Sequence, residues 1–340
     1  MSWNDTSFEK EMMKFFRGKG DSSDVLFKRY ASVRDAMYED GFFGEIKGQE
    51  PSLSDHSEKH IQDVFSRAYK IMGEDSFCYF NETEIYCLAL MILFHDVGNI
   101  FGRKGHEAIR NIAEVYNKYR ANYQNYGNER RIISTGASAH SGKSKSGNKD
   151  TLKDLNDDNL DSNLVRLREL SSILRFSDEL AEGKQRTCSF LIDKGLYSEE
   201  SMIFHKYAQI TNIFPDRNLG RVSITYNIDI PVDFNKDEQE KLKNLLKFTY
   251  YRAHKLDEER RYTKYYSEIL KVFKTVSVVY NFTKNHIPID IELKQIIFED
   301  KYPIPGELKV VDGVELETIF TKKDENYNIE KIINSIITIT

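Results

Sequence analysis

Apolar residues recur at helical spacing through most of the first 190 residues. In HIQDVFSRAYKIM (residues 60–72) they stand at positions 61, 64, 65, 68, 71 and 72, on one face of a helix. The run IYCLALMILF (residues 85–94) is almost purely apolar. It follows NETE, in which Asn81 and Glu84 have the spacing of a helix cap. These patterns predict an amphipathic helix and then a buried helix that runs to Asp96 and stops at Val97 and Gly98.

Further helices are predicted downstream. One opens at residue 106 with HEAIRNIAEVYNKY, and NERRIISTGASAH predicts another that ends near residue 140. The polar stretch over residues 141–163 has the composition of a long mobile loop or an insertion. NLVRLRELSSILRFSDELAEG (residues 163–183) is again helical and is closed by Gly183.

The pattern changes after about residue 200. RVSITYNIDI (residues 221–230) alternates strictly between apolar and other residues, which predicts a half-buried strand. A long charged helix is expected at about 237–272, and TVSVVYNF and IPIDIELKQIIF have the composition of further strands. We therefore predict a mainly α protein, with a helical domain over residues 1–200 and a smaller mixed α/β region over residues 201–340.

Composition and charge narrow the class of protein. The 340 residues are 40% hydrophobic and 30% charged, as in a globular protein. The net charge of −5 and pI of about 6.0 argue against strong binding of duplex nucleic acid. The three cysteines have no metal-like or disulfide-like spacing, and the apolar run of residues 85–94 is too short to cross a membrane. We expect a cytoplasmic protein that does not enter a membrane.

Five of the eight histidines lie between residues 56 and 140. His56 and His60 are four apart, so on one helix they would face the same way. The inward rows of two other helices end in His140 and Asp178, since each follows two residues of the row at steps of four. His95 and Asp96 end the apolar helix, and His106 opens the next one. Several helices could therefore bring imidazoles and carboxylates to one interior point.

A lone histidine on an apolar face is more often a hydrogen-bonded core residue than a ligand, and we keep that interpretation for His205, His254 and His286. Burying several ionisable side chains together is costly unless something compensates them. One or two divalent metal ions would compensate them. Imidazole and carboxylate ligands suit Mn, Mg, Fe, Zn, Co or Ni, and the sequence does not choose among these metals.

Over residues 25–190 the chain resembles the HD superfamily of metal-dependent phosphohydrolases. The family motif is a first histidine, a His-Asp doublet that ends a buried helix, and a distant aspartate. Here these are His60, the doublet His95 and Asp96 in HDVGN, and Asp178 in LRFSDEL. The resemblance implies an HD-type helical bundle and an ion held by these four residues.

Other stretches extend the resemblance. HSEKHIQDV is similar to a cyclic-nucleotide phosphodiesterase stretch, which implies His56 as a general acid and His60 as a ligand. GRKGHE and AHSG resemble the extra histidines of two-metal HD enzymes, which implies His106 and His140 as ligands of a second ion. Asp96 would then bridge the two ions, which lower the pKa of bound water and so supply the attacking nucleophile.

Basic residues follow several of the candidate ligands. They could neutralise the phosphates of a substrate, although each also has a plain surface interpretation. They are Arg103, Lys104, Lys143, Lys145, Lys184 and Arg186.

The favoured function is hydrolysis of a nucleotide-type substrate, either a phosphodiester in a cyclic or linear (oligo)nucleotide or a phosphoanhydride in a nucleoside triphosphate. Three alternatives stay open: a di-iron HD oxygenase, a nuclease on single strands, and a non-catalytic module that senses a nucleotide. The region after residue 200 could serve as a substrate lid, a platform for a partner or a homo-oligomer interface.

Overall fold

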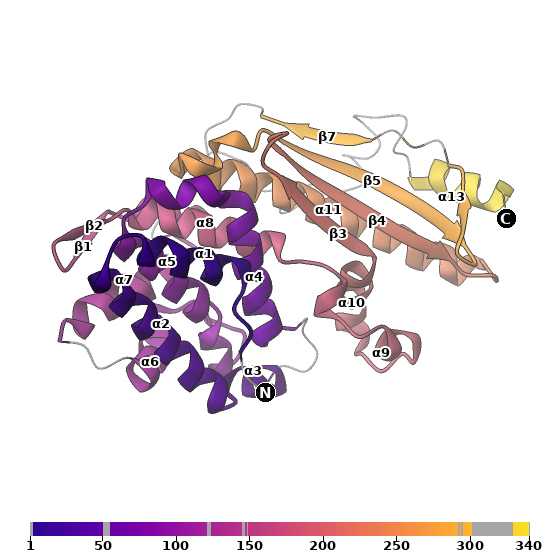
Figure 1. The fold of residues 1–340 in the computed structure, drawn as a ribbon. Helices are drawn as coiled ribbons and strands as arrows, with labels where there is room; N and C mark the ends of the chain where they lie inside the picture. The colour runs from indigo at the N-terminus through magenta and orange to yellow at the C-terminus, as the bar shows by residue number, and fades with distance from the viewer. Residues whose placement is uncertain are drawn as a thin grey trace. The chain divides into compact units, whose positions relative to one another are not determined.

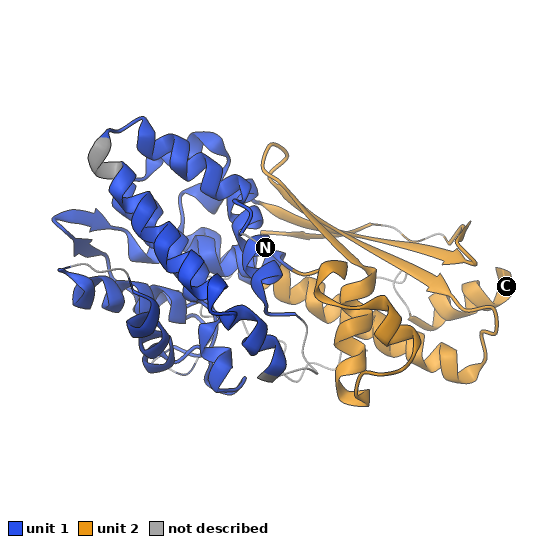
Figure 2. Ribbon diagram, turned by 60° about the horizontal axis from the view of Figure 1, so that its bottom comes forward, with its two compact units in different colours: residues 1–181, 259–273 blue, residues 182–258, 274–340 orange. Residues whose placement is uncertain are grey.

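The computed structural model describes residues 3–49, 55–120, 124–144, 147, 149–291, 293, 295–300 and 329–339. The chain forms two compact units (Figure 2). Unit 1 comprises residues 1–181 and 259–273, and unit 2 comprises residues 182–258 and 274–340. Unit 1 is a helical bundle and unit 2 holds a mixed sheet, which confirms the predicted mainly α fold with a smaller α/β part.

Unit 1 is built from helices with one small hairpin (Figure 1). Its elements are α1 (Ser7–Arg17), α2 (Asp21–Glu39), α3 (Phe42–Gln49), α4 (Glu58–Met72), η1 (Glu74–Tyr79), α5 (Glu82–Phe94), η2 (Val97–Phe101), α6 (Ile109–Tyr119), α7 (Tyr126–Ser138), η3 (Leu152–Asp154), β1 (Asp158–Leu160), β2 (Asn163–Val165) and α8 (Leu167–Leu180). The end of α11 (Lys236–Tyr266) and η5 (Ile269–Val272) complete the unit.

Helix α5 is the centre of this unit. It packs against α1, α2, α4, α7 and α8, and its residues 83–94 are all buried. The predicted cap is present, since Asn81 Oδ1 accepts from the Glu84 amide at 2.9 Å and Glu84 Oε2 accepts from the Asn81 amide at 3.0 Å. By length and composition alone the stretch Glu82–Phe101 could cross a membrane, but 89% of its apolar window is buried within the protein. It is the core helix of the bundle.

Three predicted boundaries need correction. The helix expected from residue 106 begins at Ile109, because the preceding turn runs through Gly102 and Gly105 with φ of 99° and 77°. Residues 141–163 are not one long loop, since they contain η3 and the hairpin strand β1. The helix predicted from 163 starts at Leu167, because residues 163–165 pair with β1 across a turn with positive φ at Asp161 and Ser162.

The segment 259–273 returns to unit 1 and docks on α8. Glu169 of α8 accepts hydrogen bonds from Ser267 Oγ at 2.6 Å and from the backbone amides of Glu268 and Ile269 at 3.2 and 3.3 Å. The helix predicted to reach residue 272 ends at Tyr266, and η5 follows it. Part of unit 1 that packs against α8 therefore comes from the segment 259–273, far along the chain.

Unit 2 places a helix against a mixed sheet. Its elements are η4 (Lys184–Arg186), α9 (Ser189–Asp193), α10 (Glu199–Ile210), β3 (Thr211–Asp216), β4 (Arg221–Ile230), most of α11, β5 (Thr275–Lys284), β6 (Ile287–Ile289), β7 (Ile296–Glu299) and α13 (Ile329–Ile339). The sheet order is β3-β4-β5-β6, and β7 also pairs with β5. β4 and β5 are parallel, so their connection must cross over, and α11 lies within that connection.

The alternation predicted for residues 221–230 is confirmed. The side chains at 222, 224, 226, 228 and 230 are buried. Ile228 and Ile230 share a core with Leu242 and Leu246 of α11 and with isoleucines of α13. Burial of each such aliphatic side chain stabilises the fold by about 1.5–3 kcal/mol, so this apolar face of β4 helps to hold α11 and α13 to the sheet.

Candidate metal centre

Seven polar side chains from several elements of unit 1 converge beside the end of α5. They are His56 just before α4, His60 in its first turn, His95 and Asp96 after α5, His106 in the turn before α6, His140 just after α7, and Asp178 in α8. All of the imidazoles except that of His56 are buried. The structure therefore brings together every histidine and aspartate predicted for the site.

A first group of donor atoms gathers on one oxygen of Asp96. His60 Nε2 and His95 Nε2 each lie 3.4 Å from Asp96 Oδ2 and 3.3 Å from each other. Asp178 Oδ1 lies 3.2 Å from His60 Nε2 and 3.7 Å from His95 Nε2. Two ligands about 2.1 Å from one ion are roughly 3.0–3.5 Å apart, so these spacings suit a shared divalent ion.

A second group gathers on the other oxygen of the same carboxylate. His106 Nε2 lies 3.5 Å and His140 Nε2 lies 3.6 Å from Asp96 Oδ1, and their ring centroids are 5.4 Å apart. Atoms of Asp96, His106 and His140 lie within 4.8 Å of one another, as do those of His60, His95 and Asp178. Asp96 stands between the two groups and presents one oxygen to each.

Backbone carbonyls orient three of the imidazoles. The Nδ1–H of His95 donates to Ile92 O at 2.8 Å, that of His106 to Arg103 O at 3.0 Å, and that of His140 to Ala137 O at 2.7 Å. A ring that carries its proton on Nδ1 presents a lone pair on Nε2, which is the state a metal ligand needs. The exception is His60, whose buried Nδ1 has no hydrogen-bond partner among the described residues.

The charges of the site also favour a cation. Burial would raise the pKa of the Asp96 carboxyl, but the charges of His95 and His56 hold it well below its usual range. The pKa of Asp178 is lowered in the same way, against burial, by hydrogen bonds from His60 and His95. Burial alone would lower the pKa of His95, but the two carboxylates raise it to about 10. Two ionised carboxylates in a buried site thus attract positive charge, whether a proton or a metal ion.

His106 behaves in the opposite way. Burial, together with the neighbouring His140 and Arg103, lowers the pKa of His106 to about 4. Its imidazole is therefore neutral near pH 7, as metal binding requires. The donor set, its spacing and the orientation of the rings fit one or two divalent ions.

Local backbone geometry explains how His106 reaches the site. Gly98, in the turn after the doublet, packs against the backbone of His106 so closely that an added Cβ would lie 1.9 Å from His106 O. Asn99 is also buried; its Nδ2 donates to Asp96 O at 3.0 Å and its Oδ1 accepts from Arg103. Sequence reasoning did not single out Gly98 or Asn99, although their position within HDVGN was a signal.

His56 is the most exposed histidine of the site, with 13% of its side chain accessible. It lies two residues before α4 begins, so the expectation that it shares one helix with His60 is wrong. Its Nδ1 still lies 2.7 Å from Asp96 Oδ2. Atoms of His56, His60 and Asp96 also lie within 4.8 Å of one another, so both a proton-donor role and a ligand role suit this position.

The predicted phosphate-binding residues differ in their surroundings. Arg103 Nη1 lies 3.3 Å from both Asn99 Oδ1 and His106 Nε2, at the edge of the second group. Lys104 and Lys143 are exposed close in sequence to His106 and His140. Lys145 lies outside the described residues. Lys184 and Arg186 belong to unit 2, where Arg186 is buried and pairs with Glu182 at 2.9 Å.

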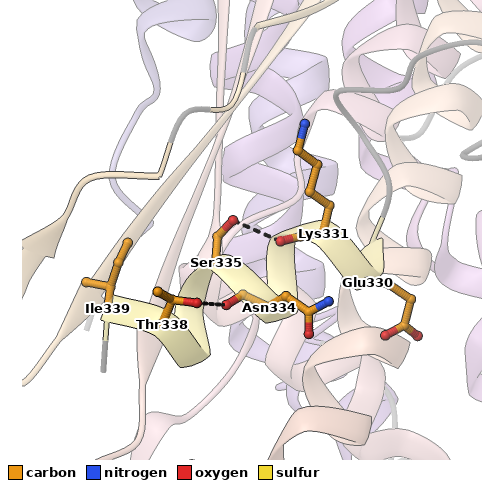
Figure 3. Close-up of a pocket in the computed structure, with 6 residues that line it drawn as sticks. All are labelled: Glu330, Lys331, Asn334, Ser335, Thr338 and Ile339. Carbon is orange, nitrogen blue, oxygen red and sulfur yellow. Dashed lines mark hydrogen bonds between the residues drawn. The ribbon is translucent and has the colours of Figure 1, made fainter.

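The other histidines have plain structural surroundings. His205 is buried against Tyr197, with ring centroids 3.4 Å apart, while His254 and His286 lie 3.7 Å from the carboxylates of Glu258 and Asp229. A hollow beside α13 (Figure 3) is lined by Glu330, Lys331, Asn334, Ser335, Thr338 and Ile339. Its two drawn hydrogen bonds run from Ser335 and Thr338 to carbonyls of the same helix. The hollow contains no histidine or cysteine, so it offers no second candidate centre.

Comparison with known families identifies the family of this chain. A family model described as HD-CE matches residues 50–228, more than half of the chain, and the protein belongs to this family. The matched region contains all seven residues of the centre, and the match confirms the resemblance to HD-type proteins. No curated protein and no solved structure matches the chain.

Proposed function

We propose that this HD-CE protein is a metal-dependent phosphohydrolase that cleaves a phosphodiester or phosphoanhydride bond in a nucleotide-type substrate. The single observation that carries the proposal is the arrangement around Asp96, whose two oxygens face two separate groups of histidines. When bound there, divalent ions activate water and polarise a phosphoryl oxygen. The protein's own side chains would bind the ions, donate a proton to the leaving group and bind the phosphates of the substrate.

The two carboxylates and four histidines would hold the ions. Asp96 would be shared between them, His60, His95 and Asp178 would complete the first set, and His106 and His140 the second. Because the rings of His95, His106 and His140 are already oriented by backbone carbonyls, little rotational freedom remains to be lost on binding. These three ligands would therefore be preorganised for metal binding.

His56 would protonate the oxygen of the leaving group. Its imidazole is held by Asp96 at 2.7 Å and remains partly exposed, so a substrate can approach it. Arg103 Nη1 lies 3.3 Å from His106 Nε2 of the second group, and its guanidinium suits the charge of a phosphate. The other basic residues that the sequence suggested stay proposed contacts for further phosphate groups: Lys104, Lys143, Lys145, Lys184 and Arg186.

The test combines metal analysis with a substrate screen. Purified protein should contain a divalent metal, and His95→Ala together with Asp96→Ala should remove both the metal and the hydrolysis of nucleotides, cyclic dinucleotides or short RNA and DNA. Phosphate release and product mass report the activity. His286→Ala is the matched control, because this histidine is exposed in unit 2. If the doubly substituted protein keeps its metal and its activity, the proposal is wrong.

A di-iron oxygenase is the second candidate, and the donor set of four imidazoles around a shared carboxylate favours it. Purified protein would then contain iron in preference to other metals, and turnover would require oxygen. Hydrolysis that proceeds equally well without oxygen excludes this candidate.

A further inference from the structure

Arg175 of α8 is buried and lies one turn before Asp178. Its guanidinium makes a two-point contact with Glu259 of α11, with Nε–Oε2 and Nη2–Oε1 distances of 2.5 and 2.8 Å. Burial of a charged pair costs desolvation, and apolar side chains in its place are often no less stable. A contribution to stability alone therefore does not explain the ion pair of Arg175 and Glu259.

The remaining nitrogen of Arg175 reaches the loop after His140. Arg175 Nη1 donates to Lys149 O at 3.0 Å and to Thr151 Oγ1 at 2.8 Å. Thr151 Oγ1 in turn donates at 2.6 Å to the carbonyl of Ala139, the residue before His140. An unbroken chain of hydrogen bonds thus joins Glu259 to the backbone beside a candidate ligand.

The same loop is held a second time by the segment 259–273. Tyr266 OH donates to Asp150 Oδ2 at 2.7 Å, between the two loop residues that Arg175 contacts. His140 needs such support because α7 ends at Ser138, so its backbone lies beyond the last helical turn. His60 and Asp178, in contrast, lie within α4 and α8, and His95 is the C-cap of α5.

We propose that the segment 259–273 positions His140 through Arg175 and Thr151, and thereby sets the affinity of the second ion without changing that of the first. Arg175, Glu259 and Thr151 are positioning residues, because none of them reaches the ion itself. The inference rests on the proposed metal centre and deepens it. Loss of an outer hydrogen-bond partner of a ligand lowers metal affinity roughly 10- to 100-fold.

The experiment uses the full chain and titrates it with Mn²⁺. Calorimetry gives the two affinities, and the electron paramagnetic resonance signal of a coupled Mn²⁺ pair reports the second ion directly. Thr151→Val removes the hydroxyl at constant shape, Thr151→Ser restores it, and Glu259→Gln removes the distant charge. Thr263→Val is the matched control, since Thr263 is buried in the same segment and its hydroxyl bonds only to backbone carbonyls of its own helix.

We expect Thr151→Val and Glu259→Gln to weaken the second ion by about 10- to 100-fold while the first ion binds normally. Thr151→Ser and Thr263→Val should retain both ions. The double variant Thr151→Val, Glu259→Gln should lose less affinity for the second ion than the two single losses combined, because both residues act through one chain of hydrogen bonds. If Glu259→Gln does not fold, the two Thr151 variants still decide the question.

The outcomes that contradict this inference can be told apart from those that contradict the proposed function. Folded Thr151→Val with an unchanged second affinity overturns the inference, and so does equal weakening of both ions in Thr151→Val and Thr263→Val. Wild-type protein that takes one ion overturns the inference but leaves a one-ion hydrolase standing. Wild-type protein that binds no ion overturns the proposed function as well.

Discussion

Gly98→Ala should weaken the binding of the second ion to the centre. An alanine Cβ at this position would lie 1.9 Å from His106 O and 2.8 Å from His106 C, whereas real Cβ contacts are essentially never under 3.0 Å. The backbone of His106 must therefore retreat by about 1 Å. The obstacle is backbone rather than the tip of a flexible side chain, so no rotamer change relieves it.

The size of the effect follows from the geometry. Metal–ligand distances tolerate only about ±0.2 Å, so a displacement several times larger takes His106 out of coordination range. Overpacking of this kind costs about 1–3 kcal/mol, which corresponds to roughly 5- to 150-fold weaker binding of the second ion if the strain falls on His106. The first group should change less, because the three atoms nearest to an added Cβ at Gly98 all belong to His106.

Titration of the full chain with Mn²⁺ measures the affinities for the two ions. Melting curves with and without metal show whether the strain lowers the stability of the fold or only the binding of the second ion. Gly127→Ala is the matched control, since Gly127 is exposed in the first turn of α7 and a Cβ there meets nothing within 4 Å. Alanine at an open helical position should stabilise the protein by about 0.5–1 kcal/mol. A Gly98→Ala protein that binds both ions as tightly as wild type, with unchanged melting, would refute the argument.

Two further predictions follow from the site. His56→Gln should lower turnover roughly 10²- to 10⁴-fold while the metal content stays intact. Loss of metal would instead make His56 a ligand. In metal-free protein the pKa of His95 is about 10 against an ordinary value of about 6.5, so the bound proton stabilises the folded state below about pH 6.5 and this stability is lost as the pH rises toward about 10. In chelator-treated protein, the free energy of unfolding should fall as the pH rises across this window, and it should fall less in His95→Gln. A free energy of unfolding that does not change with pH in the wild type would contradict this arrangement of charges.

Much of the fold can be predicted from local pattern. The capping box at Asn81 and Glu84, the buried run after it and the alternating strand at 221–230 all depend on residues a few positions apart. Hydrogen bonds of caps and the periodicity of apolar side chains act over that range, so the sequence displays them directly. The helices that carry His60 and Asp178, and the helix that ends just before His95 and Asp96, follow from the same signals.

Tertiary structure decided the features that depend on distant partners. The division of the two Asp96 oxygens between histidine groups, the packing of Gly98 on His106, and the return of Glu259 to Arg175 each join residues that no local periodicity relates. The hairpin at 158–165 and the late start of α6 were missed for a related reason, since turns with positive φ at Asp161, Ser162 and Gly105 override the helical propensity around them. The sequence alone thus determined which side chains could form a metal centre, and packing between remote segments determined how they share it, because close approach depends on the shape of both surfaces.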